Sequence, residues 1–406
     1  MGSYSCLFYL LLHAMTSHIM PTYGRLPVSF THGQGAWLWD KNDIRYLDAI
    51  SGIAVCNLGH AHPTVHNAIC KQSEKLLHTS NLYGIDLQER LADKLCQLSD
   101  MENAFFCNSG AEANEAAIKL ARRYGNNQGI TNPVIITMEK SFHGRTMATL
   151  SATGNTKIQD GFSPLLEGFI HVAFNDIPAI EQAIQNHSNI VAILVEPIQG
   201  EGGVNIPGAD YLNKIKQLCD QHQLLMMIDE IQTGIGRTGK FLAYQHNNII
   251  PDVCTLAKAL GNGVPIGACL ASGKATNLLT AGSHGSTFGG NLLACSAALA
   301  VLDTFDQEEL IADATKKGAY ISNTITEKLQ DNEQVSEIRH KGLMIGIELL
   351  KPCINLAQEA LAKNLLINVT SEKTIRLLPP LIINQEQIDY LVNTLVELVT
   401  EHTEQQ

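Results

Sequence analysis

Short apolar runs alternate with amphipathic stretches between Pro133 and Ala271. Runs of this length, apolar on both faces, are typical of strands that are buried within a sheet. The predicted strands are VIIT (134–137), IVAILVEP (190–197), LLMMIDE (224–230), DVCTLA (252–257) and IGACLAS (266–272). Residues 209–221, between two of them, have the pattern of an amphipathic helix. The alternation predicts an α/β fold in which helices cover a mainly parallel sheet.

A further strand, a tight turn and a helix are predicted in the stretch AFFCNSGAEANEAAIKLARRYG, which precedes these runs. The 3.6-residue spacing of a buried helix face is kept by Ala113, Ala117, Leu120 and Tyr124. The start of this helix allows two interpretations. Its unpaired N–H groups could bind an anion, and Ser109-x-x-Glu112 is also a capping box, which by itself would account for these residues.

The two ends of the chain have a different pattern. Residues 35–50 alternate like a small meander, and 307–406 mixes long polar helices with the short strands LMIGIELL and TIRLLPPLII. We therefore expect one large central domain and a smaller one assembled from both termini. The predicted limits are a leader without assigned role (1–19), small domain (20–75), large domain (76–300) and small domain again (301–406).

Composition excludes several classes of protein. The 406 residues carry a net charge of −12 and no long basic run, which argues against broad neutralisation of nucleic-acid phosphates. The 10 cysteines lie in apolar stretches without a C-x-x-C pair, a pattern that predicts buried, reduced thiols rather than disulfides or a zinc site. The apolar run at 6–15 is too short to span a bilayer, which takes ~20 residues. We therefore predict a cytoplasmic protein.

Candidate chemistry lies where the predicted strands end, because ligands of open α/β sheets bind outside the carboxyl ends of the strands. Asp229 and Glu196 close two strands, and Lys258 follows a third. Asp229 could equally be a capping or salt-bridge carboxylate, and a lone lysine is usually exposed. Spacing alone leaves these alternatives open.

Two further motifs are weak. Residues 234–239 match G-x-G-x-x-G but lack the strand–turn–helix context of a dinucleotide site, so a loop is predicted. His60 and His62 could present two imidazoles together, but no neighbouring residue in the sequence completes a metal site, and no metal is predicted.

Taken in order, seven blocks resemble those of the class III aminotransferases, pyridoxal-phosphate (PLP) enzymes of fold type I. The blocks are GAWLWDKNDIRYLDAISGIAVCNLGHAHP, NSGAEANEAAIKLAR, SFHGRTMATLSATGN, EPIQGEGGV, DEIQTGIGRTGKFLAYQH, LAKALGNGVPIGA and GSTFGGNLLACSAALAVL. The resemblance runs from about Thr22 to the C-terminus. It departs from the family at Asn262, where glycine is common, at Ala111, where threonine is common, and at the variable position Cys56.

The resemblance implies a large domain with a mainly parallel seven-stranded sheet, a small α+β domain built from both termini, and PLP as cofactor. Lys258 matches the lysine that bonds the cofactor, and Asp229 the carboxylate that faces the ring nitrogen. The other cofactor-binding residues implied are Ser109, Gly110, Ala111, Phe142, His143, Gln232 and, reaching the phosphate of the neighbouring subunit, Thr287. Thr287 thereby implies a homodimer with shared active sites.

TYGRLPV, SGIAV and LGHAHP are most similar to family members that act on acetylornithine. The resemblance therefore implies transamination between N2-acetyl-L-ornithine and 2-oxoglutarate, which are small-molecule substrates. Arg145 matches the residue for the distant carboxylate, with Ser286 assisting from the partner subunit. Glu201 and Arg376 match positions that face each other over the cofactor, where an exchangeable ion pair could select between the two amino acids.

Three alternatives stay open from the sequence. The substrate could be another ω-amino acid, such as ornithine, succinylornithine or 4-aminobutyrate. The chain could be a non-catalytic binding protein that keeps the fold, although it retains Lys258 and Asp229. An oxidoreductase that uses NAD is disfavoured because the glycine motif lacks its structural context.

Overall fold

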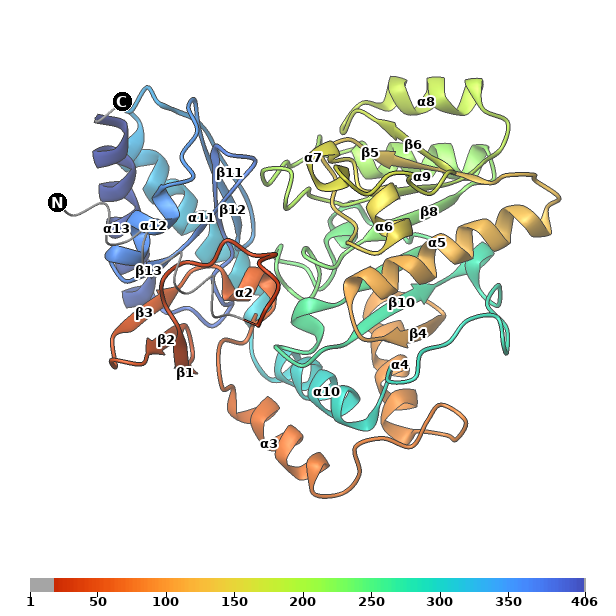
Figure 1. Ribbon diagram of the computed structural model, residues 1–406, viewed down its shortest axis with the longest axis horizontal. Helices are drawn as coiled ribbons and strands as arrows, with labels where there is room; N and C mark the ends of the chain where they lie inside the picture. Colours follow the sequence, from red (N-terminus) through yellow and green to blue (C-terminus); the bar gives the residue numbers. More distant parts are fainter. Residues whose placement is uncertain (1–17, 405–406) are drawn as a thin grey trace.

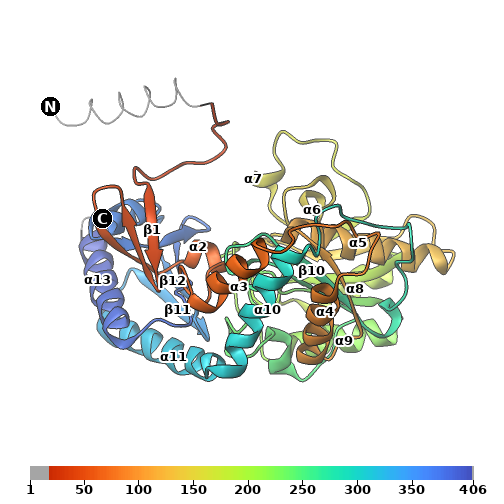
Figure 2. The ribbon, with the colours of Figure 1, turned by 90° about the horizontal axis from the view of Figure 1, so that it is seen from below.

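The computed structural model describes residues 18–404, which form two bodies side by side (Figure 1). Nearly all of the predicted leader, residues 1–17 of 1–19, lies outside the described part. The bodies are connected through the consecutive helices α10 (Leu292–Gln307) and α11 (Leu310–Leu329), which run from one into the other (Figure 2). No helix within 18–404 is both long and apolar enough to cross a membrane.

The larger body is built on a seven-stranded sheet in the order β4-β10-β9-β8-β7-β5-β6. In that order the strands are Asn103–Cys107, Gly267–Ala271, Val253–Leu256, Leu225–Asp229, Ile190–Val195, Val134–Met138 and Phe169–Val172. Only β10 runs antiparallel to its neighbours within this sheet. The mainly parallel sheet is therefore confirmed, and every strand predicted for this sheet forms. β6 was not predicted, because its short, partly exposed FIHV run lacks a strong apolar pattern.

Helices cover both faces of this sheet. Successive strand residues alternate between two cores, so that Ile135 packs on one face and Ile136 on the other. The first face is covered by α5 (Gly110–Asn127) and α6 (Met147–Ala152). The second face carries α4 (Asp86–Ser99), α8 (Ile177–Asn186), α9 (Tyr211–Gln221) and α10. All four residues of the predicted α5 face are buried, as expected from their spacing.

The smaller body holds two four-stranded sheets, β1-β2-β3-β13 and β11-β12-β15-β14. In those orders the strands are Phe30–Gln34, Trp37–Asp40, Arg45–Asp48 and Leu365–Leu366, then Val335–Lys341, Met344–Leu349, Thr374–Leu377 and Asn368–Thr370. β3 and β13 pair in parallel, so residues from both ends of the chain share one sheet. Of the predicted strand TIRLLPPLII only β15 forms, because the two prolines that follow cannot donate ladder hydrogen bonds.

Further helices complete the two bodies. The smaller one also contains α2 (Ser51–Ala54), α12 (Leu356–Ala362) and α13 (Gln385–Glu404), and the larger one α7 (Thr156–Gln159). α3 (Pro63–Ser73), within the predicted small-domain range 20–75, packs against α10. The domain limits 20–75, 76–300 and 301–406 stay a prediction.

The cysteines are unpaired throughout the described part of the chain. Most are buried, as predicted, but Cys70 is exposed on α3, and Cys56 and Cys96 are half-buried. The expectation that all lie in the core was therefore wrong at these positions.

Candidate active site

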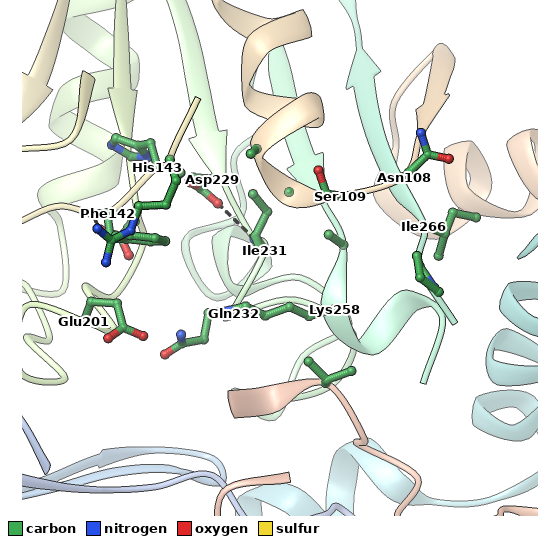
Figure 3. A pocket seen from close by; sticks show the side chains of 18 of the residues that line it. Asn108, Ser109, Phe142, His143, Glu201, Asp229, Ile231, Gln232, Lys258 and Ile266 are labelled. Atoms are coloured by element: carbon green, nitrogen blue, oxygen red, sulfur yellow. Dashed lines mark hydrogen bonds and ion pairs between the residues drawn. The ribbon is translucent and has the colours of Figure 1, made fainter. Parts of the chain in front are cut away.

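A cavity of about 440 Å³ lies at the carboxyl ends of β7, β8 and β9 and the start of α5 (Figure 3). This is the edge of the sheet at which the sequence placed candidate chemistry. Ten of the predicted site residues line it: Ser109, Gly110, Ala111, Phe142, His143, Arg145, Glu201, Asp229, Gln232 and Lys258. The fold thus gathers side chains that lie as far apart in the sequence as Ser109 and Lys258.

Asp229 ends β8 and is almost fully buried. Its Oδ2 lies 2.8 Å from His143 Nδ1 and accepts a 2.7 Å hydrogen bond from Asn114 Nδ2, while Oδ1 accepts from the Ile231 N–H. Thr255 in turn donates to Asn114 Oδ1 at 2.8 Å. These contacts fix the carboxylate at the cavity. Asp229 therefore does not serve as the helix cap that its position also allowed.

Asn114 was missed by the sequence analysis. It lies on the buried face of α5 between alanines, and its amide also donates to the His143 carbonyl at 2.8 Å. A polar amide on an apolar helix face requires partners inside the protein. An asparagine among the alanines of this helix face was therefore a sign of a buried polar contact in the sequence. The sequence could not identify Asp229 as the partner.

Lys258 lies two residues after the end of β9, at the start of the 3-10 turn Lys258–Leu260. Its backbone has a φ of +46°, in the left-handed region that is costly for a residue with a side chain. Burial lowers the pKa of the Lys258 amine to about 8; Arg376 also lowers it, while Glu201 and Asp229 oppose the shift. An amine with this pKa is partly neutral near pH 7 and can act as a nucleophile or a base. The structure therefore excludes the alternative of an ordinary exposed lysine.

The start of α5 combines both interpretations of the sequence. Ser109 caps the helix, because its Oγ accepts the Glu112 N–H at 3.2 Å. The Glu112 carboxylate bonds Asn108 rather than the Ser109 N–H, so only half of the predicted capping box forms. Gly110 packs so close to Ile231 that an added Cβ would lie 2.7 Å from it. The first turn of α5 therefore reaches the cavity, where its N–H dipoles favour an anion.

Glu201 and Arg376 form an ion pair between the two bodies. Arg376, on β15, is fully buried; its Nη1 lies 2.7 Å from Glu201 Oε1 and 3.2 Å from Gln232 Oε1. Burial favours the neutral form of Glu201, but Arg376 and Lys258 outweigh this and lower its pKa. Nη2 of Arg376 is buried and has no partner within residues 18–404. This unpaired donor is available to a carboxylate.

Arg145 is exposed at the rim of the cavity. Its guanidinium carbon lies 5.7 Å from the centre of the Phe142 ring, within the range of a cation–π contact. It makes no ion pair with any described residue, so the alternative of a surface salt bridge does not hold.

Ser286 and Thr287 do not line this cavity. Ser286 Oγ accepts hydrogen bonds from Asn108 Nδ2 and the Gly289 N–H, and Thr287 is exposed. The chain does not bring these two residues to its own site, so their assignment to a partner's site stays a prediction.

The two weak motifs have structural explanations. Residues 234–239 lie in turns, as predicted, and Arg237 from them is buried against the carbonyls of Leu343 and Pro379. His60 Nε2 lies 2.8 Å from Asp48 Oδ2, a partner that the sequence analysis did not identify. Within residues 18–404 no cluster of His, Cys, Asp and Glu could hold a metal ion.

The donor set of the cavity fits PLP. A buried carboxylate suits a protonated ring nitrogen, the start of α5 suits a phosphate, and the Phe142 ring suits stacking on an aromatic ring. Lys258, in the same cavity, provides the amine that can bond the cofactor. Ala111 lacks a hydroxyl, which leaves backbone N–H groups and Ser109 as the phosphate donors at this turn.

Comparisons with known proteins agree with this geometry. Residues 19–399 match the family model described as aminotransferase class-III. The chain is 56% identical to an acetylornithine aminotransferase of Nitrosomonas europaea, over 95% of this chain and 98% of that protein.

Solved structures are similar over nearly the whole chain. An acetylornithine aminotransferase of Elizabethkingia anophelis is 34% identical, with a TM-score of 0.85 over 98% of this chain and 99% of that one. An ornithine aminotransferase of Toxoplasma gondii, in which PLP partly occupies the active site, is 32% identical, with a TM-score of 0.92 over 98% and 95% of the two chains. With the site and fold described above, these matches show that the chain belongs to the class-III aminotransferases, whose cofactor is PLP.

Proposed function

We propose that this chain transfers the side-chain amino group of N2-acetyl-L-ornithine to 2-oxoglutarate. The products are N-acetyl-L-glutamate 5-semialdehyde and L-glutamate, and the reaction belongs to arginine biosynthesis. The names of the curated relatives support this substrate. Within the site, the proposal is carried by one observation, the buried ion pair of Glu201 and Arg376.

When bound, PLP supplies a carbonyl carbon that takes up the amino group and a ring that withdraws electrons from the substrate. Asp229 keeps a proton on a basic ring nitrogen, because its negative charge is held in place by His143 and Asn114. Phe142 presents an aromatic face to the ring. The remaining cofactor contacts are assigned to Ser109, Gly110, Ala111, His143 and Gln232.

Lys258 has two tasks in this proposal. Its neutral amine bonds the cofactor in the resting enzyme, and once released it takes a proton from the substrate carbon and returns it. The lowered pKa favours both tasks, because a larger fraction of the amine is neutral near pH 7.

Glu201 and Arg376 adapt the site to two different substrates. Acetylornithine, which enters by its side-chain amine, places methylene groups near Arg376, and Glu201 then neutralises the buried guanidinium. Glutamate brings an α-carboxylate, which replaces Glu201 on Arg376. The unpaired Nη2 of Arg376 allows this carboxylate to bind with two hydrogen bonds.

Arg145 is assigned to the distant carboxylate of either substrate, since its guanidinium is exposed at the rim and has no carboxylate partner in the described chain. Ser286 is assigned to the same carboxylate in the site of a second copy. Thr287 would reach that copy's cofactor phosphate, so the enzyme is proposed to be a homodimer with shared sites. Leu82, Tyr83 and Phe288, exposed by 86%, 70% and 61%, provide an apolar surface for that contact. A cytoplasmic location is proposed with this biosynthetic role.

Ornithine is the second candidate substrate, because ornithine aminotransferases are among the similar solved structures. Both substrates present a terminal amine, so turnover on acetylornithine, ornithine and succinylornithine, each with 2-oxoglutarate, separates them. We expect the highest kcat/KM for acetylornithine. Higher kcat/KM for ornithine would refute the proposed substrate.

The ion pair is tested by measuring the two half-reactions separately. Arg376→Ala should raise the KM for glutamate by at least tenfold, because it deletes the ion pair of that substrate. Glu201→Ala should slow the acetylornithine half-reaction and spare the glutamate one, because it leaves Arg376 charged and unpaired against methylene groups.

Glu401→Ala is a suitable control, since it removes an exposed partner of Lys363 far from the cavity and should change neither half-reaction. Equal losses on both substrates in the Glu201 and Arg376 variants would contradict an exchangeable pair.

A further inference from the structure

Asn262 bridges the two bodies beside the cofactor site. Its side-chain Oδ1 accepts the Leu58 N–H at 2.9 Å, and its Nδ2 donates to the Gly59 carbonyl at 3.0 Å. One amide thus bonds the backbones of two consecutive residues in a segment that lies about 200 residues away in the chain. Leu58 and Gly59 are buried. If the Asn262 amide were removed, the Leu58 N–H and the Gly59 carbonyl would each lose a hydrogen-bond partner that water cannot readily replace.

On one side, this bridge is connected to the turn that carries Lys258. Lys258 and Asn262 both have left-handed backbones, with φ of +46° and +44°. Within the turn, the Gly261 N–H donates to the Lys258 carbonyl at 3.2 Å and the Asn262 N–H to the Ala259 carbonyl at 3.2 Å. A turn with a strained residue persists only where surrounding contacts hold it. The Asn262 amide supplies such a contact at the end of the turn.

On the other side, the bridge reaches a segment that is itself firmly held. Asn57 Nδ2 donates to the Ile235 carbonyl at 2.8 Å, and the Leu381 N–H donates to the Asn57 carbonyl at 2.7 Å. An added Cβ on Gly59 would lie 2.5 Å from the Gly35 carbonyl oxygen, so this backbone packs directly on the smaller body. Val55, two residues before Asn57, lines the cavity. Residues 57–59 therefore form a fixed support.

We propose that Asn262 is a positioning residue that fixes the Lys258 turn against residues 57–59 and thereby keeps the Lys258 amine aligned with the cofactor. This inference rests on the proposed role of Lys258 but not on the choice of substrate. It gives a function to a position at which the chain departs from the family pattern.

The test removes the amide without straining the backbone. Asn262→Gly keeps the left-handed conformation, which glycine adopts without a steric penalty, and deletes both cross-links. Asn262→Asp is the second variant; it keeps the acceptor for Leu58 but loses the donor to Gly59. Asn277→Gly is the matched control, because Asn277 has a φ of +64°, is exposed and lies outside the cavity.

The main measurement uses the PLP-loaded protein without substrate. We expect Asn262→Gly to release PLP to a scavenging apoenzyme about tenfold faster than the unchanged protein, the scale of one to two lost hydrogen bonds. The pH midpoint of its cofactor absorbance should also shift. Asn262→Asp should change both in the same direction by less, and Asn277→Gly should change neither.

A purely structural role predicts a different result. The unfolding midpoint of Asn262→Gly would then fall while PLP release and the absorbance midpoint stayed equal to those of Asn277→Gly, and this result would overturn the proposal. Because no amino-acid substrate is present, failure of the proposed substrate would leave these measurements unchanged. In the half-reactions, we expect kcat to fall for both amino acids with little change in KM.

Discussion

Lys258 lies among charged groups of both signs, and its chemistry depends on which effect dominates. Burial and Arg376 favour the neutral amine, whereas Glu201 and Asp229 favour the charged one. Burial is the largest of these effects, so the pKa falls to about 8. The residue type follows from the sequence, but this balance exists only because the fold brings Arg376, Glu201 and Asp229 close to the Lys258 amine.

The lowered pKa predicts how the cofactor-free protein reacts with PLP. Only the neutral amine attacks a carbonyl, so the bonding rate should rise about tenfold from pH 7 to pH 9 and then level off. Stopped-flow absorbance across pH 6–10.5 measures this. A rate that still rises tenfold per pH unit above pH 9 would mean that the pKa of Lys258 is that of an exposed lysine. Lys258→Ala should show no bonding at any pH.

At the scale of elements, the segment after β3 combines strain with a buried charge. Ser51, Ile53 and Ala54 all have positive φ, which is costly for side-chain-bearing residues. Asp48 supports this turn, because its Oδ1 accepts the Ile50 and Ser51 N–H groups at 3.0 and 2.8 Å. Its Oδ2 holds His60. A single carboxylate therefore fixes both ends of the segment that leads to the cavity.

The His60–Asp48 pair predicts a pH dependence of stability. Burial opposes charging of His60, but Asp48 and Cys56 outweigh it and raise its pKa to about 9. A histidine with a raised pKa stabilises the folded state fully below its unfolded pKa of about 6.5, and this contribution is lost as pH rises through 9.

Chemical denaturation of the cofactor-free protein measures this effect. The difference in unfolding free energy between the unchanged protein and His60→Gln should fall from about 3 kcal/mol at pH 6 towards zero above pH 9. His187→Gln, at an exposed position, is the control. A difference that is constant across this range would show that His60 is not charged by Asp48.

At the scale of the whole molecule, the smaller body holds the loop that carries Glu201. Arg339 Nε donates to the Val204 carbonyl at 2.8 Å, and the Thr370 hydroxyl donates to the Glu201 carbonyl. The Glu201 backbone is thereby fixed. The substrate carboxylate can therefore replace Glu201 on Arg376 if the Glu201 side chain alone moves. Movement between the bodies would instead shift Glu201 and Arg376 together.

The proposed homodimer is tested by mixing two inactive variants. Lys258→Ala removes the essential amine, and Thr287→Glu places a negative charge near the partner's phosphate site. If sites are shared, a hybrid dimer contains one intact site, with Lys258 from one copy and Thr287 from the other. When the two variants are refolded together, each hybrid dimer should therefore have up to half of the activity of an unchanged dimer. Activity that stays at the level of the separate variants would contradict shared sites.

Most elements of the central sheet and the residue types of the site follow from the sequence. Strand and helix periodicity are local properties, since alternating or 3.6-residue spacing decides which face of an element can be buried. That is why all predicted strands of the central sheet form, while the partly exposed β6, with its weak pattern, was missed. The resemblance then assigned roles to Lys258 and Asp229, which local spacing alone had left open.

Most contacts between these residues arise from the packing of the whole chain. Asn114 meets Asp229 across 115 residues, and Asn262 meets Leu58 across 204. The contact of Arg376 with Glu201, across 175 residues, was expected from the family resemblance but not from local spacing. Such pairs are selected by the packing of whole elements, and local sequence carries no record of their distance. The pKa of Lys258 depends on the same packing, because burial and neighbouring charges are properties of the assembled cavity rather than of the chain.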